Sequence, residues 1–200
     1  MATSQPKSPA RKLRWFQYSL RSLFLLTLVV SLVMGWVAPR MKRTRQEDEA
    51  VEEIKKLHGQ VQYDYEVRQS GNPPLDEEPP GPAWLRNLLG ENFFATVVKV
   101  HFDYDAASVT DRDLEPLKGL TQLQWVDLRG TQVTDAGLEY LKGLKQLQAL
   151  DLFGTHVTDS GLQRLRGLTQ LSSLHLVRTH VTDEGVERLQ RALPKCRIRR

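Results

Sequence analysis

The sequence contains a single cysteine, Cys196, among its 200 residues. One cysteine excludes an internal disulfide, so the folded chain must be stabilised by packing and hydrogen bonds. The sequence also lacks a glycine-rich phosphate loop and the GxSxG, HExxH and CxxC patterns that carry hydrolytic, metal-dependent or redox chemistry. We therefore expect a protein that is not an enzyme, holds no cofactor or metal and takes no small-molecule substrate.

Acidic residues are absent from the first 46 positions, which contain nine of the 28 lysines and arginines. The remaining chain carries 19 basic and 24 acidic residues, a net charge of −5, although the overall pI is about 9.3. The basic character therefore belongs to two short segments, residues 1–22 and 39–46. A nucleic-acid-binding domain needs a basic face on the folded domain itself, so nucleic acid is not an expected partner.

Charged residues are also absent from residues 23–38, which read LFLLTLVVSLVMGWVA. As a helix this run would span about 24 Å, slightly less than the ~30 Å hydrocarbon core of a bilayer. Trp15 and Trp36 would lie about 32 Å apart along that helix, as expected for aromatic side chains at the two interfaces. We interpret residues 23–38 as a transmembrane helix in a lipid bilayer. A cleaved secretory signal and a core helix of a soluble protein are the alternatives.

A block of 24 residues recurs through the C-terminal half of the chain. It begins at Asp127 (DLRGTQVTDAGLEYLKGLKQLQAL), at Asp151 (DLFGTHVTDSGLQRLRGLTQLSSL) and, in truncated form, at His175 (HLVRTHVTDEGVERLQRALPKCRI). One period earlier, Asp103 begins a looser copy, DYDAASVTDRDLEPLKGLTQLQWV. A repeat of this length predicts stacked coils. The four predicted units are residues 103–126, 127–150, 151–174 and 175–200.

Within one unit the leucine spacing changes from that of a strand to that of a helix. Leu150 and Leu152 are two residues apart, so both should point inward from a short strand. Leu162 and Leu165 are three residues apart and should share one face of a short helix, which Thr158 is placed to cap. One such coil buries too little apolar surface to fold alone, so its neighbours must stabilise it.

The pattern LxxLxxLxLxxTxVTDxGLxxLxxL, present at Leu144–Leu168, resembles the leucine-rich repeat, and its VTDxGL portion is similar to the cysteine-containing subclass that is frequent in bacterial proteins. The resemblance implies a short α/β solenoid with parallel strands on a concave face and short helices on a convex face, here preceded by one transmembrane helix. Ala107, Arg191 and Ala192 depart from the pattern. These departures fall in the end units, where capping coils are usually atypical.

Residues 47–102 are predicted to form the N-terminal cap of the solenoid. Within this region, residues 71–82 (GNPPLDEEPPGP) contain five prolines among acidic residues and should form a stiff connector without a core. The other elements expected in the cap are a helix at 47–57, a strand at 61–67, a helix at 84–89 and a strand at 93–102.

The repeat strands are expected to present three columns of side chains, because residues that flank an inward leucine face away from the core. Trp125 and Phe153 would be exposed aromatic side chains, which supply much of the energy of protein interfaces. The predicted columns are His101, Trp125, Ala149 and Ser173; Asp103, Asp127, Asp151 and His175; and Asp105, Arg129, Phe153 and Val177.

Three carboxylates, those of Asp103, Asp127 and Asp151, are predicted to lie in one row at the strand spacing of about 4.8 Å, where they would repel one another. Arg129 in the neighbouring column and His175 at the end of the row are expected to compensate this charge. A basic protein partner or a bound cation would be alternative sources of compensation.

These features predict a single-pass membrane protein whose leucine-rich repeats bind a protein or peptide ligand on the concave face. A structural scaffold of a membrane or envelope complex and a cytoplasmic substrate-recognition adaptor are alternative functions. Basic residues occur on both sides of residues 23–38, so the positive-inside rule discriminates little. The absence of acidic residues before Glu47 and the short N-terminal segment favour a cytoplasmic N-terminus with the repeats outside the cytoplasm.

The predicted orientation can be tested with epitope tags at the two ends of the chain. In cells whose outer envelope has been permeabilised, added protease should remove a C-terminal tag and spare an N-terminal tag, because only the repeats would be accessible. Immunoblots against both tags measure the result. A C-terminal tag that stays protected until the cells are lysed would instead support the cytoplasmic adaptor.

Overall fold

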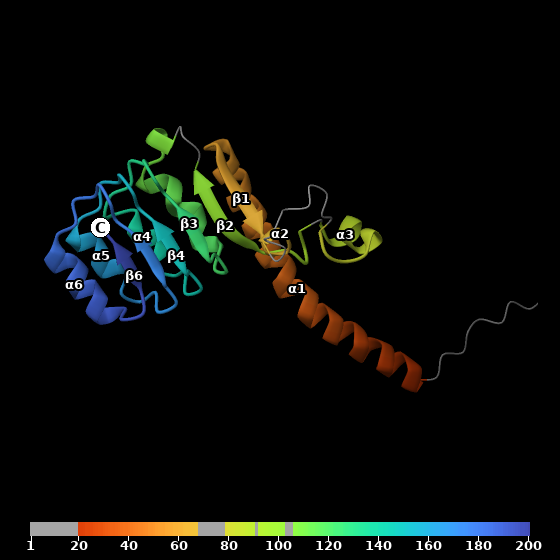
Figure 1. The fold of residues 1–200 in the computed structure, drawn as a ribbon. Coiled ribbons are helices and arrows are strands. Elements are labelled where there is room, and N and C mark those ends of the chain that lie inside the picture. The colour runs from red at the N-terminus through yellow and green to blue at the C-terminus, as the bar shows by residue number, and fades with distance from the viewer. Residues whose placement is uncertain (1–19, 68–78, 91, 103–105) are drawn as a thin grey trace, which may run out of the picture. The chain divides into compact units, whose positions relative to one another are not determined.

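The computed structural model describes residues 20–67, 79–90, 92–102 and 106–200 (Figure 1). The chain divides into two compact units, Met1–Pro39 and Arg40–Arg200. The described elements are α1 (Leu20–Lys56), β1 (Gly59–Tyr63), α2 (Asp64–Val67), α3 (Ala83–Leu89), β2 (Val97–Phe102), η1 (Ala106–Ser108), η2 (Asp111–Gly119), β3 (Trp125–Asp127), α4 (Leu138–Leu141), β4 (Ala149–Asp151), α5 (Asp159–Leu165), β5 (Ser173–His175), α6 (Asp183–Ala192) and β6 (Arg197–Arg199).

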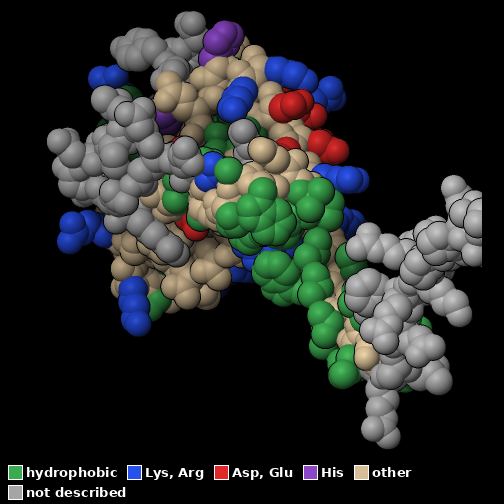
Figure 2. All heavy atoms as spheres, turned by 90° about the vertical axis from the view of Figure 1, so that its right-hand side faces the viewer, with side chains coloured by type: hydrophobic (Ala, Val, Ile, Leu, Met, Phe, Trp, Pro, Cys, Tyr) green, Lys and Arg blue, Asp and Glu red, His purple; other side chains and the backbone are tan. Residues whose placement is uncertain are grey.

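The first unit contains the apolar part of α1. Its large hydrophobic side chains between Leu23 and Trp36 are all more than half exposed, and hydrophobic side chains cover this stretch in Figure 2. The most apolar window of the helix has a mean hydropathy of 2.1 and no buried residue, so the helix is long and apolar enough to cross a membrane. A signal sequence can have the same properties.

α1 continues without interruption through the predicted basic flank, residues 39–46, and includes the predicted helix that begins at Glu47. Side-chain contacts one helical turn apart support this continuation. Arg43 Nε donates a hydrogen bond to Glu47 Oε1 at 2.6 Å, and Thr44 Oγ1 donates to the carbonyl oxygen of Arg40 at 3.0 Å. Further along, Ala50, Val51 and Ile54 lie on one side of α1 and are buried in the core of the second unit.

The second unit is built on a sheet with the strand order β1-β2-β3-β4-β5-β6. β2 to β6 pair in parallel, and β1 pairs antiparallel to β2 at one edge. α4, α5 and α6 lie beside one another along one side of the sheet (Figure 1). Between the two layers, the leucines predicted to point inward, including Leu150, Leu152, Leu162 and Leu165, are 0–2% exposed. The predicted strand-to-helix coil is therefore confirmed.

A pair of hydrogen bonds joins the helix start of each coil to the next coil. Asp135 Oδ1 accepts a hydrogen bond from the backbone N–H of Thr158 at 2.8 Å, and Asp135 Oδ2 accepts one from Thr158 Oγ1 at 2.6 Å. Thr158 in turn caps α5 by accepting from the N–H of Ser160. The same pair of bonds joins Asp111 to Thr134 and Asp159 to Thr182.

The glycine of the VTDxG pattern is required by the same contact. A Cβ atom on Gly161 would lie 2.3 Å from Asp135 Oδ1, far inside van der Waals contact. The corresponding atoms on Gly137 and Gly185 would lie 2.5 Å and 2.1 Å from the carboxylates of Asp111 and Asp159. Threonine, aspartate and glycine of the repeat therefore form a single contact between adjacent coils.

A buried threonine occupies the position where leucine-rich repeats commonly carry asparagine. Thr155 is 1% exposed, and its Oγ1 donates a hydrogen bond to the carbonyl oxygen of Leu152 at 2.8 Å. Thr131 makes the same bond to Leu128 in the preceding coil. Because its hydroxyl is paired in this way, the threonine avoids the cost of a buried, unsatisfied polar group.

The cap differs from its prediction at two strands. The first strand ends at Tyr63 instead of continuing to Val67, because Glu66 accepts a hydrogen bond from the N–H of Tyr63 at 2.9 Å and the chain turns into α2. The second strand begins at Val97 and not at Phe93. The predicted helix at 84–89 is confirmed as α3, which ends at Gly90 with φ of 103°.

The last coil closes with a short strand, β6. Ile198 of β6 pairs with Leu174 of β5, one period earlier in the chain. Cys196, which directly precedes β6, is 4% exposed and forms no disulfide. Burial raises the pKa of its thiol to about 11, so the side chain acts as a small apolar group at neutral pH.

The contact between coils predicts which glycine tolerates a methyl group. Asp135→Ala leaves the N–H and hydroxyl of Thr158 unpaired, so the free energy of unfolding should fall by about 1–3 kcal/mol. Gly161→Ala should be at least as harmful, because its methyl group would meet the Asp135 carboxylate. Gly143→Ala is the matched control, since its Cβ would have no neighbour within 4 Å. Urea denaturation of the full chain in micelles measures these changes, and an equal loss from Gly143→Ala would contradict the assignment.

The stability of the fold should also fall at acid pH, because the contact between Asp159 and Thr182 favours an ionised carboxylate. Hydrogen bonds from the backbone N–H and hydroxyl of Thr182 lower the pKa of Asp159 below its ordinary value of 3.8. A carboxyl group whose pKa is lower in the folded state stabilises the fold above its unfolded pKa, and this contribution is lost as the pH falls through the folded pKa. The thermal midpoint should therefore drop below about pH 4. Asp159→Asn should reduce this drop, and an unchanged profile would contradict the prediction.

Candidate binding face on the open side of the sheet

The strand register defines two columns of side chains on the open face of the sheet, the face opposite α4, α5 and α6. Each side chain in a column comes from a different strand, and neighbours are paired in the sheet. The first column is Lys99, Trp125, Ala149, Ser173 and Arg197, and the second is His101, Asp127, Asp151, His175 and Arg199.

The predicted position of His101 is wrong by one column. Lys99, and not His101, pairs with Trp125, and His101 pairs with Asp127. Val109 follows His101 by eight residues, whereas Val133 follows Asp127 by six, so the first coil holds two additional residues before its valine. Counting back by one period therefore misplaces the strand. Asp103 and Asp105, predicted in the second and third columns, lie outside the described residues.

The two described carboxylates of the second column are compensated by Arg129. Its Nε lies 2.9 Å from both carboxylate oxygens of Asp127, and its Nη2 lies 2.7 Å from Oδ2. The same Nε lies 3.7 Å from Asp151 Oδ2. The hydrogen bond to Asp127 raises the pKa of Arg129. The predicted compensation of Asp151 by Arg129 is therefore confirmed, whereas the closer pairing of Arg129 with Asp127 was not expected from the diagonal placement.

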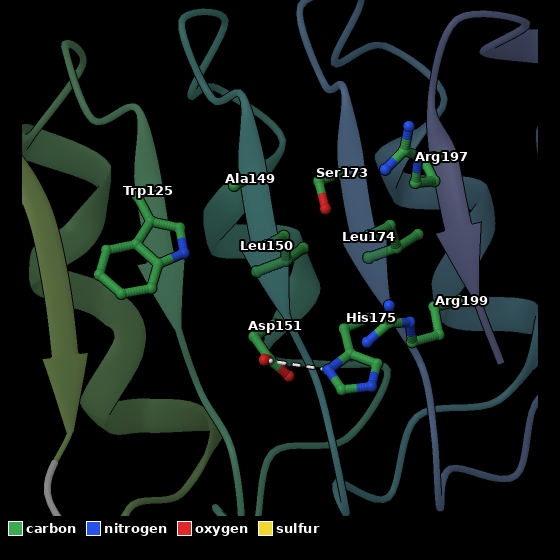
Figure 3. A pocket seen from close by; sticks show the side chains of 9 residues that line it. All are labelled: Trp125, Ala149, Leu150, Asp151, Ser173, Leu174, His175, Arg197 and Arg199. Carbon is green, nitrogen blue, oxygen red and sulfur yellow. Dashed lines mark hydrogen bonds and ion pairs between the residues drawn. The ribbon is translucent and has the colours of Figure 1, made fainter.

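Asp127 is less accessible than predicted, because Arg129 covers it. Asp127 is 2% exposed, whereas the Arg129 side chain is 59% exposed. Asp151 is half-buried and accepts from the backbone N–H of Phe153 at 2.9 Å. His175 Nδ1 lies 3.1 Å from Asp151 Oδ2, which is the predicted cap at the end of the row (Figure 3).

A hollow of about 230 Å³ lies between Trp125 and the last strand (Figure 3). The small side chains of Ala149 and Ser173 form the bottom of the hollow. The larger side chains of Trp125 and Arg197, from the same column, lie at its two ends. Its lining residues are Trp125, Ala149, Leu150, Asp151, Ser173, Leu174, His175, Arg197 and Arg199.

Arg197 and Arg199 are the binding-face residues that the sequence analysis missed. Both are exposed on β6 and continue the columns beyond Ser173 and His175. The repeat period could have identified them. Once Ile198 is matched to Leu174, 24 residues earlier, the same period pairs Arg197 with Ser173 and Arg199 with His175. They give the hollow a positively charged end.

The aromatic side chains of the face are partly covered by basic residues. Lys99 Nζ lies 5.2 Å from the ring centre of Trp125, and the guanidinium of Arg178 lies 5.3 Å from the ring centre of Phe153. Phe153 also lies 5.7 Å from the His175 ring. Both aromatic rings and Val177, the last predicted residue of the third column, are half-buried and therefore remain accessible to a partner.

Two histidines form another row near the helix starts. The rings of His156 and His180 stack with centres 5.9 Å apart, and His156 Nε2 lies 3.0 Å from Gln132 Oε1. Gln132 thus occupies the place of a third imidazole. Among the described residues, no three His, Cys, Asp or Glu side chains are grouped so that they could hold a metal ion.

Removing the Arg129 side chain should destabilise the fold, because the buried carboxylate of Asp127 would lose its charged partner. Arg129→Met takes away the charged donors of Asp127, so the free energy of unfolding should fall by about 1–3 kcal/mol. Arg178→Met removes an exposed arginine that covers only Phe153, and its effect should stay within about 0.5 kcal/mol. Denaturation with urea measures both, and equal effects would show that Asp127 does not depend on Arg129.

Comparison with known proteins finds a family model that matches two segments of the repeat region. Residues 145–165 and 168–189 match the family model described as Leucine Rich repeat. No curated protein gives a significant match to the chain. Among solved structures, an internalin from Listeria monocytogenes is 25% identical with a TM-score of 0.33, over 43% of this chain and 30% of its own.

A leucine-rich repeat protein from Leptospira interrogans is 23% identical with a TM-score of 0.32, over 42% of this chain and 26% of its own. This chain therefore spans less than a third of the length of either neighbour. The family match and the stacked parallel coils together support the prediction that the C-terminal region is a leucine-rich repeat solenoid.

Proposed function

We propose that this chain is a single-pass membrane protein whose leucine-rich repeats bind a protein or peptide on the open face of the sheet. The observation that carries the proposal is the hollow between Trp125 and Arg197, with Phe153 beside it. Tryptophan and arginine, with tyrosine, are enriched among the residues that dominate the energy of protein interfaces.

The size and charge of the hollow indicate the kind of ligand. Pockets that enclose small molecules usually measure about 300–1,000 Å³, so a hollow of about 230 Å³ on an open sheet suits one or two side chains of a larger partner. The carboxylates of Asp127 and Asp151 are already compensated, whereas Arg197 and Arg199 add positive charge. A partner that presents an apolar side chain to Trp125 and an acidic side chain to these arginines would fit.

The proposed membrane tether rests on the apolar part of α1. Residues 23–38 would cross the lipid bilayer, with the N-terminus in the cytoplasm and the repeats outside it. The exposure of every large hydrophobic side chain from Leu23 to Trp36 supports this assignment, because such a surface is unfavourable in water. The VTDxGL pattern resembles the cysteine-containing repeat subclass that is frequent in bacterial proteins, so the proposed membrane-anchored protein would be bacterial.

We also propose that the chain is not an enzyme. Ser173, His175 and Asp151 lie together on the open face, and His175 contacts Asp151. Within the described residues, however, no hydrogen bond joins Ser173 to His175, and a nucleophile needs such contact with its base. Ser173 and His175 lie on the same strand two residues apart, and the only contact drawn in Figure 3 is the one between His175 and Asp151.

Site-specific crosslinking of the full chain in its native membrane tests the binding function. A photoreactive residue at Ala149, on the floor of the hollow, should capture a partner, and Trp125→Ala with Phe153→Ala should reduce capture about tenfold or more, since loss of anchors of this kind costs at least ~1.4 kcal/mol. Tyr140→Ala is the matched control. Tyr140 is an aromatic residue on the helix side, covered by Lys118 at 4.5 Å much as Lys99 covers Trp125.

The outcomes separate the proposed functions. Capture that depends on Trp125 and Phe153 but not on Tyr140 supports ligand binding on the open face. Capture that is unaffected by the double substitution, together with loss of a membrane complex on deletion of the chain, would favour the structural scaffold. Circular dichroism of the purified variants confirms that each one folds.

A further inference from the structure

Exposed large hydrophobic side chains occur in two places among the described residues. One is the stretch from Leu23 to Trp36, and the other is α3, where Trp84 is 68% exposed and Leu88 is 71% exposed. No residue of α3 is buried. Exposure of a tryptophan and a leucine to water on one short helix is unfavourable. We therefore expect another surface to cover α3.

The two side chains form one apolar face on a helix that is held in place. Trp84 and Leu88 are four residues apart, so they lie on the same side of α3. Arg86 donates hydrogen bonds from Nη1 to the carbonyl oxygens of Pro79 at 2.5 Å and Gly81 at 3.3 Å, which fixes the entry to the helix. The helix sequence, AWLRNLL, contains no acidic residue, so nothing in it would repel a membrane surface.

Arg40, which follows the apolar run in the chain, contacts the segment after α3. Arg40 Nε donates a hydrogen bond to the carbonyl oxygen of Phe93 at 3.1 Å, and its guanidinium lies 5.7 Å from the Phe93 ring centre. Phe93 is 1% exposed, so this contact is part of the core of the unit. Arg40 is the second residue after the charge-free run, residues 23–38.

Chain length limits how far α3 can lie from this point. Leu89, at the end of α3, and Phe93 are four residues apart in the chain, so their Cα atoms lie at most about 14 Å apart even if the segment is fully extended. If residues 23–38 span a bilayer, Arg40 lies at the boundary between hydrocarbon and headgroups. The headgroup layer is about 5–8 Å thick on each side, so α3 is within reach of it.

We propose that α3 lies in the interface of the same bilayer that residues 23–38 cross, with Trp84 and Leu88 inserted at the boundary between headgroups and acyl chains. This inference rests on the proposed membrane tether. Tryptophan prefers this layer because its ring is apolar while its N–H can still be hydrogen-bonded. The repeat domain would then touch the membrane at two points, which would restrict the directions in which its open face can point.

Fluorescence quenching of single-tryptophan variants of the full chain tests the proposal. The chain has four tryptophans, Trp15, Trp36, Trp84 and Trp125, and phenylalanine would replace three of them in each variant. Each variant is reconstituted in phosphatidylcholine vesicles whose acyl chains carry bromine close to the headgroup. Trp84 and Trp36 should both be quenched about twofold or more relative to unbrominated vesicles, as expected for residues at the interface.

The Trp125 variant is the matched control, because its ring lies on the open face of the repeats and should not be quenched. In the Trp84 variant, adding Leu88→Gln should weaken the quenching by removing half of the apolar face. Near-ultraviolet circular dichroism confirms that all variants are folded.

The Trp36 and Trp84 variants distinguish failure of this inference from failure of the tether. Quenching of Trp36 without quenching of Trp84 would overturn the placement of α3 and leave the anchor intact. An α3 covered by a second copy of the chain would give this result together with a blue-shifted Trp84 emission that depends on protein concentration. Absence of quenching at Trp36 would overturn both the tether and the inference that rests on it.

Discussion

Stacking of each coil on the next is the constraint on which the rest of the structure depends. A single coil of 24 residues has a strand of three residues and a short helix, too little to be stable alone. The aspartate at each helix start accepts two hydrogen bonds from the threonine of the next coil, and the glycine leaves room for that carboxylate. These contacts set the distance between coils, and the buried leucines fill the space between strand and helix.

Stacking in register also produces the chemistry of the open face. It brings Asp127 and Asp151 to neighbouring strands, where two uncompensated carboxylates would repel each other. Arg129 and His175 balance this charge within the domain. Charges that are already paired contribute little to binding, so the groups left to attract a partner are the aromatic rings and the arginines of β6. In the proposed function these groups form an open surface for side chains of a larger molecule, and not an enclosed site.

Much of this arrangement follows from the residue pattern. The inward leucines, the capping threonines and the pairing of Ile198 with Leu174 depend on contacts one period apart, and the repeat predicts them directly. The repeat period does not predict the position of His101. The first coil has two extra residues before Val109, and only the strand pairing shows that they lie between β2 and Val109. The end of β1 at Tyr63 was also missed, since the alternating pattern continues into a segment that Glu66 turns into a helix.

The sequence by itself determined the coil, its period and the apolar segment near the N-terminus, because each of these is a local pattern of side-chain type. Only the tertiary structure decided the register of β2, the burial of Asp127 beneath Arg129, the hollow beside Arg197 and the contact of Arg40 with Phe93. These features join residues that are distant in the chain or unequal in spacing. Their positions depend on how strands pair and side chains cover one another, and no local pattern of residues encodes that.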